Sequence, residues 1–144
     1  MSAARSGVVY WDTSAIVSTL FLDRHSDEAL AAARAPGTHL MSSLGWAEVQ
    51  AVIARIERER ALALDLVRSA REAVDHGPWV RLSVDPDRHQ TAALALAWPL
   101  RGADLWHLAA AKALQADLPE LQLLSFDAQL AAAALGEGFG RRDR

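Results

Sequence analysis

Cysteine is absent from the chain. Disulfide bonds and thiolate metal sites are therefore excluded, and a reducing cytosol is allowed. We expect a cytoplasmic protein. Any metal site must be built from carboxylates, hydroxyls or histidines. Carboxylates favour hard cations such as magnesium or manganese.

Positive charge is not in excess, because 15 lysine and arginine residues face 18 acidic ones, for a net charge of −3. A protein that binds nucleic acid by charge alone should be basic, so such a ligand would need a different attraction. Long apolar runs are also missing. The stretch from Val8 to Leu22 is too short to span a bilayer and contains Asp12. The same aspartate argues against a signal peptide, and we expect no membrane association.

The chain does have enough apolar material for one core, since 51% of its 144 residues are hydrophobic. That composition argues against disorder. We expect a single domain over residues 1–140, followed by a basic, solvated tail over residues 141–144.

Short apolar runs alternate with helical patterns along the sequence. Strands are expected at residues 8–11, 39–41, 79–82 and 121–125. Helices are expected at residues 14–22, 27–34, 88–100, 102–115 and 128–135, with two more between 49 and 76 separated by the charged run 57–60. This alternation predicts an α/β three-layer sandwich, with a mostly parallel central sheet of about four to five strands flanked by helices. In such sheets, ligands bind beyond the carboxyl ends of the strands.

Four acidic residues stand where expected strands end or helices begin. Asp12 ends the first strand, Glu48 lies near the start of a helix, Asp104 lies in a first helical turn, and Asp127 follows the fourth strand. Each has an ordinary structural explanation. Asp12 and Asp127 are candidate helix N-caps, and Glu48 and Asp104 are candidate first-turn acids favoured by the helix dipole.

Three features set these four acids apart from ordinary caps. Glu48 lies four residues before Val52 on the apolar stripe of its helix, so it should point inward. All four acids also fall at the same expected edge of the sheet, where partly buried carboxylates repel one another unless a cation is present. A divalent metal would remove that cost. Their flanks are largely apolar: Tyr10-Trp11, Trp46-Ala47, Leu105-Trp106 and Ser125-Phe126.

The segments around the four acids, taken in order, resemble the four motifs of PIN domains. These segments are Asp12-Thr13-Ser14-Ala15, Trp46-Ala47-Glu48-Val49, Arg101-Gly102-Ala103-Asp104-Leu105-Trp106-His107-Leu108-Ala109 and Leu124-Ser125-Phe126-Asp127. The resemblance covers nearly the whole chain, and the compact length is similar to the VapC-type toxins of bacterial toxin–antitoxin pairs. No single motif is specific, but the ordered set of four is. The family often has threonine where Ser125 stands, which also supplies a hydroxyl.

What the resemblance implies is a ribonuclease that needs magnesium or manganese. Asp12 and Asp104 are then the expected metal ligands, and Glu48 and Asp127 complete the catalytic cluster. Thr13, Ser14 and Ser125 are expected to support the acids or contact phosphate, with helix capping as the alternative. A hard metal activates water and stabilises charge on a scissile phosphate, and it lets an acidic pocket accept RNA.

The same resemblance implies three partners: an RNA substrate, a small cognate antitoxin protein that covers the pocket, and a second copy of the chain in a homodimer. Three other functions remain open. They are a PIN nuclease in RNA processing, a non-catalytic PIN-like binding domain, and a receiver-type domain that takes up a phosphoryl group. A receiver would need a lysine near its last strand. It is disfavoured because the only lysine, Lys112, lies in the middle of an expected helix.

Two further residues have competing interpretations. His107, three residues after Asp104, is either a ligand or proton shuttle, or a structural hydrogen-bonding residue, and an all-oxygen site for a hard metal favours the structural role. Arg101 either contacts RNA phosphate, pairs with an acid, or is a solvated loop charge. The five tryptophans are candidates for base stacking, although their positions beside the acids or in a strand favour the core for most of them.

Overall fold

We describe residues 7–139 of the chain in a computed structural model. The expected basic tail, residues 141–144, lies outside the described residues. None of the described helices combines the length and apolar character needed to cross a bilayer.

A parallel sheet forms the centre of the molecule. Its strands are β1 (Gly7–Trp11), β2 (Gly37–Ser42), β3 (Trp79–Leu82) and β4 (Gln122–Leu124), in the spatial order β3-β2-β1-β4. Each neighbouring pair is parallel, so the carboxyl ends of all four strands meet at one edge. The predicted α/β three-layer architecture is confirmed, with four strands in the sheet.

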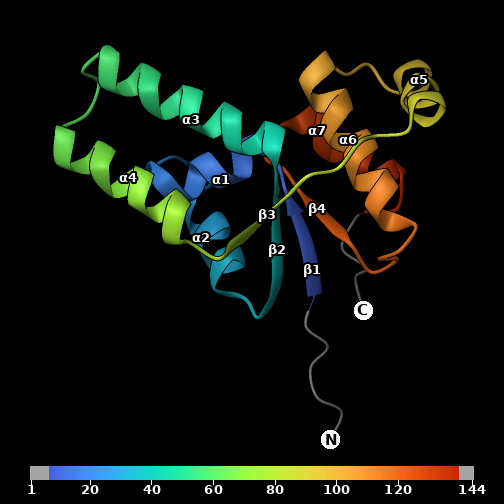
Figure 1. Cartoon of the computed structure of the whole chain (residues 1–144), viewed down its shortest axis with the longest axis horizontal. Helices are drawn as coiled ribbons and strands as arrows, with labels where there is room; N and C mark the ends of the chain where they lie inside the picture. The colour runs from blue at the N-terminus through green and yellow to red at the C-terminus, as the bar shows by residue number, and fades with distance from the viewer. Residues whose placement is uncertain (1–6, 140–144) are drawn as a thin grey trace, which may run out of the picture.

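Seven helices of the described region cover the two faces of this sheet (Figure 1). The face covered by the first four of them packs around Trp11 and Met41, and the face covered by the last three packs around Tyr10 and Leu40. Successive strand residues point to opposite faces, which is why neighbours in β1 and β2 enter different cores. The helices are α1 (Thr13–Leu20), α2 (Ser26–Arg34), α3 (Ser43–Arg58), α4 (Leu64–His76), α5 (Arg88–Ala97), α6 (Gly102–Gln115) and α7 (Ala128–Gly136).

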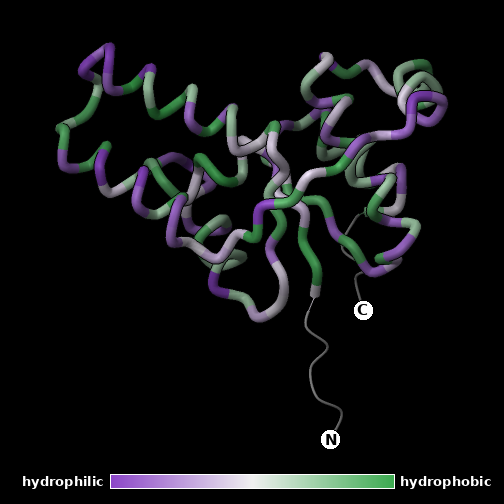
Figure 2. The backbone as a smooth tube through the Cα atoms, in the orientation of Figure 1, coloured by the Kyte–Doolittle hydropathy of each residue, from purple (hydrophilic) through white to green (hydrophobic). Residues whose placement is uncertain are grey.

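Most element boundaries agree with the sequence pattern, and the differences have local causes. Helix α5 ends at Ala97, short of the expected residue 100, because Pro99 favours extended backbone at Trp98 (φ −131°, ψ 136°). Strand β2 is longer than expected because it pairs with β1 from Gly37 onward. The charged run at residues 57–60 does separate two helices, and Figure 2 shows it as a hydrophilic end of α3.

Candidate active site

The carboxyl edge of the sheet carries a cleft of about 340 Å³. All four acids singled out from the sequence line it, together with Thr13, Ser14 and His107. Asp12 directly follows β1, Glu48 lies in α3, Asp104 lies in α6, and Asp127 is the residue that precedes α7. Segments that are far apart in the sequence therefore contribute to one surface.

Asp12 is the most buried of the four acids, with 3% of its surface exposed. It is the N-cap of α1, as one interpretation of the sequence proposed, because its Oδ1 accepts from the backbone N–H of Ala15 (2.9 Å). The hydroxyls of Ser14 (2.7 Å to Oδ1) and Ser125 (2.6 Å to Oδ2) also donate to it. Burial raises the pKa of Asp12 in spite of these hydrogen bonds. The cap is therefore also a buried acid of the cleft.

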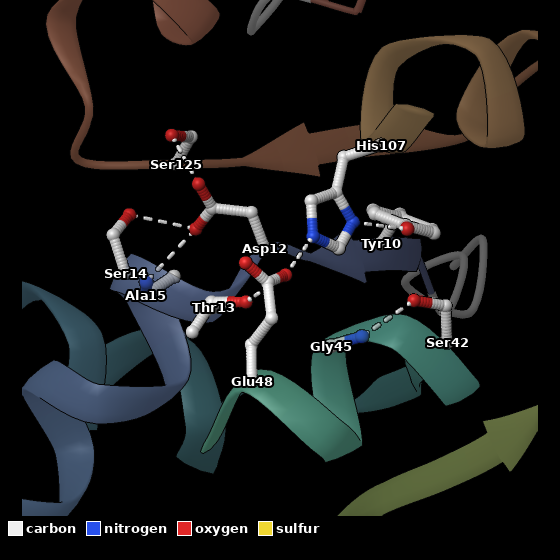
Figure 3. A network of polar contacts seen from close by, with 10 residues as sticks. All are labelled: Tyr10, Asp12, Thr13, Ser14, Ala15, Ser42, Gly45, Glu48, His107 and Ser125. Atoms are coloured by element: carbon white, nitrogen blue, oxygen red, sulfur yellow. Dashed lines mark hydrogen bonds and ion pairs between the residues drawn. The ribbon is translucent and has the colours of Figure 1, made fainter. Parts of the chain in front are cut away.

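Glu48 lies in the second turn of α3, so the first-turn explanation does not apply to it. Its carboxylate is half-buried between two donors, the hydroxyl of Thr13 (2.8 Å) and Nε2 of His107 (2.7 Å), both on Oε1 (Figure 3). Burial alone would raise the pKa of Glu48, but these hydrogen bonds outweigh burial and hold the pKa below its usual value.

Asp104 and Asp127 lie at the amino ends of two helices. Asp104 is a first-turn acid of α6, and its pKa is raised by burial and then by the neighbouring charges of Asp127 and Asp12. Asp127 is the N-cap of α7, where it accepts from the backbone N–H of Leu130 (2.9 Å). Its side chain is exposed, so the expectation that all four acids are partly buried is wrong for Asp127.

The three hydroxyl residues act on the acids and not as helix caps. Thr13 donates to Glu48, while Ser14 and Ser125 donate to Asp12. The hydroxyls of Ser14 and Ser125 also accept backbone N–H groups, from Phe126 (3.0 Å) and Asp127 (3.1 Å). These bonds join the loop after β4 to the start of α1.

Sequence reasoning did not single out Arg55, which lines the same cleft from α3. It follows Glu48 by seven residues, or two helical turns, and that spacing was the available signal. Among residues 7–139, Arg55 forms no ion pair with an acid. Arg101, by contrast, is an exposed residue before α6 and is not part of the cleft lining.

The donor set of the cleft suits a hard divalent cation, since the four acids supply only oxygen ligands. The like charges that raise the pKa of Asp104 show that negative charge is in excess there. Within the described residues, no three acidic or histidine side chains are already grouped as a complete cation site. Magnesium commonly binds through one or two carboxylates plus water and substrate phosphate, so the residues present fit such an ion.

Comparison with known proteins agrees with this geometry. A family model for the PIN domain matches residues 9–136. The chain therefore belongs to the PIN domain family, whose members are generally nucleases that use divalent metal ions. One solved structure, that of PAE2754 from Pyrobaculum aerophilum, has a TM-score of 0.59 and 17% sequence identity, and the match covers 93% of this chain and 90% of that one. At that identity the likeness shows the fold alone. No curated protein matches the chain in sequence.

Proposed function

We propose that the protein is a ribonuclease dependent on magnesium or manganese, and that it is the toxin of a cytoplasmic toxin–antitoxin pair. The observation that carries the nuclease proposal is the meeting of four acids from separate segments in one cleft of a PIN domain. The toxin role rests on the resemblance of the four motifs and of the compact length to VapC-type proteins.

Asp12 and Asp104 are the proposed metal ligands, with Glu48 and Asp127 completing the site. The lone pairs of Asp12 Oδ1 are used by Ser14 and Ala15, whereas Oδ2 accepts only from Ser125, so Oδ2 is the atom available to a cation. When bound, the cation would supply activation of water and neutralisation of charge on the scissile phosphate. The protein's own contribution is to hold the acids in place through Thr13, Ser14 and Ser125.

Net negative charge does not exclude RNA as the substrate. Three helices begin at or beside the cleft (α1, α6 and α7), and the positive ends of their dipoles favour phosphate there. Arg55 would add one cationic contact at the rim of the acidic group.

RNA cleavage mapping tests the nuclease. The purified protein should cut RNA in magnesium or manganese and leave it intact in chelator, and Asp12→Asn should abolish the cuts. Intact RNA with wild-type protein under every metal condition would refute the nuclease and favour a non-catalytic binding domain.

Growth tests the toxin role separately. Induction of the wild-type protein should arrest growth, Asp12→Asn should not, and a small protein encoded beside it should restore growth. A folded, RNA-cleaving protein that is harmless when overproduced would favour the second candidate, a PIN nuclease in RNA processing.

A further inference from the structure

A buried histidine connects the protein core to Glu48. His107 reaches inward from α6 with 1% of its surface exposed, and Tyr10 at the end of β1 is fully buried. His107 Nε2 lies 2.7 Å from Glu48 Oε1, and His107 Nδ1 lies 2.6 Å from the Tyr10 hydroxyl (Figure 3). Side chains from β1, α6 and α3 therefore form one hydrogen-bonded chain that ends at the cleft.

The direction of this chain follows from the chemistry of its ends. An ionised carboxylate only accepts hydrogen bonds, so Nε2 of His107 must carry the proton that it shares with Glu48. In the neutral imidazole the other nitrogen, Nδ1, is then an acceptor, and the Tyr10 hydroxyl donates to it. The Tyr10 hydroxyl thus selects the ring tautomer that donates to Glu48.

The two oxygens of Glu48 are treated differently. Oε1 accepts from both Thr13 and His107, which occupies its two lone pairs. Oε2 accepts no hydrogen bond from any residue between 7 and 139. Because Glu48 lines the cleft, Oε2 is the oxygen left for a ligand there.

A second buried histidine shows what a purely structural role looks like. His39 also uses both ring nitrogens, since Nδ1 accepts from Trp11 Nε1 (3.0 Å) and Nε2 lies 3.0 Å from the backbone oxygen of Ala35. Its partners include no carboxylate, and it is not part of the cleft lining. His107 differs because its chain ends on an acid at the cleft. With both its nitrogens engaged, His107 is also not placed to be a ligand itself.

We propose that Tyr10 and His107 are positioning residues, which fix the Glu48 carboxylate so that Oε1 is held by the protein and Oε2 is presented to a divalent cation. The inference rests on the proposed function. A glutamate has several rotatable bonds, and fixing them before the cation arrives lowers the entropy lost on binding. Hydrogen-bonding partners of this kind typically account for about a 10- to 100-fold change in metal affinity.

Calorimetric titration of the metal-free protein with manganese chloride alone tests the pair. Tyr10→Phe removes one hydroxyl and keeps the ring, and His107→Leu removes the donor to Glu48. We expect both to weaken manganese binding, by up to about 100-fold for His107→Leu. His107→Gln, whose amide can donate to Glu48, should restore part of the affinity. His39→Leu is the matched control, expected to lower the melting temperature without changing the manganese Kd.

A double-substitution cycle separates positioning from general damage to the fold. In a Glu48→Gln background, Tyr10→Phe should change the manganese Kd by no more than about twofold, because its effect is transmitted through the Glu48 carboxylate. If Tyr10→Phe and His39→Leu weaken manganese binding equally, or if neither weakens it, the positioning role is overturned and the nuclease proposal stands. Wild-type protein that binds no manganese overturns both.

Discussion

The hydrogen bonds and the burial of the Asp12 carboxylate have opposite effects on its pKa. It caps α1 and accepts hydrogen bonds from two serine hydroxyls, and these bonds favour the ionised form. Burial has the larger effect and raises its pKa. Asparagine keeps the carbonyl oxygen that accepts from Ala15 and removes the negative charge. Asp12→Asn therefore separates the cap from the charge.

We expect Asp12→Asn to melt no lower than wild type in chelator at neutral pH, because it relieves a buried charge beside other acids. Metal should reverse the order. Wild type should gain about 1–3 kcal/mol of stability when the metal concentration is roughly ten- to a hundredfold above Kd, and the variant should gain much less. Melting curves of both proteins in chelator and in millimolar magnesium or manganese measure this. No metal-dependent shift in wild type would reduce Asp12 to an ordinary cap.

Arg55 gives a second prediction for a single residue, which depends on RNA being the ligand. Arg55→Gln should weaken RNA binding. It should also make the fall of log binding constant with log salt concentration less steep by about 0.7, the value for one phosphate contact on a single strand. Arg58→Gln is the control, since Arg58 is exposed on the same helix and is not part of the cleft lining. Equal slopes for the two variants would remove Arg55 from the RNA interface.

At the scale of the helix, three amino termini meet at the acidic cleft. Asp12 caps α1, Asp127 caps α7, and Asp104 lies in the first turn of α6. The positive end of each helix dipole favours a nearby anion, so the fold offsets part of the repulsion among these acids. Capping and a place in the cleft are thus compatible for the same residue.

Asp127 shows how the two roles can be measured apart. Asp127→Asn should keep the hydrogen bond from Leu130 and cost little stability, whereas Asp127→Ala should lose it and cost about 1 kcal/mol. Both should impair RNA cleavage, because both remove the carboxylate. Denaturant unfolding and a cleavage assay on the same samples supply the comparison. Full cleavage by Asp127→Asn would assign Asp127 to the cap alone.

The elements show what the sequence was able to predict. Strand β3 and helix α6 have the expected bounds because Gly77-Pro78, Asp85-Pro86 and Gly102 mark local breaks. The position of Glu48 on an apolar stripe correctly suggested a side chain turned inward. The exposure of Asp127 and the hydrogen bond between His107 and Glu48 were not predictable, because both depend on how helices from the two faces of the sheet come together at its carboxyl edge.

For the whole molecule, the excess of acids predicts a pH-dependent difference between two proteins. A carboxylate whose pKa is higher in the folded than in the unfolded state lowers the stability of the protein at pH values above its unfolded pKa. This stability returns as pH falls through the folded pKa. Asp12→Asn lacks one such group. In metal-free samples, its stability advantage over wild type should be largest near neutral pH and should shrink as pH falls toward the ordinary aspartate pKa of 3.8.

Paired denaturant titrations between neutral and mildly acidic pH test this expectation. Glu48, whose lowered pKa has no contribution from Asp12, contributes equally to both proteins and cancels in the difference. Asp104, whose pKa the charge of Asp12 helps to raise, adds to the difference in the same direction. An advantage that grows as pH falls would mean that the Asp12 carboxylate is stabilised by folding.

The hydrogen bond from Ser125 to Asp12 joins residues 113 positions apart. Of the four strands, β4 is the last to be synthesised, and it pairs with β1, the first. The part of the chain before Ser125 contains β1, β2 and six of the seven described helices, but it lacks both Ser125 and Asp127. A translation product that stops before Ser125 therefore lacks a hydroxyl that holds Asp12 and one of the four acids of the cleft, so it cannot present the complete site.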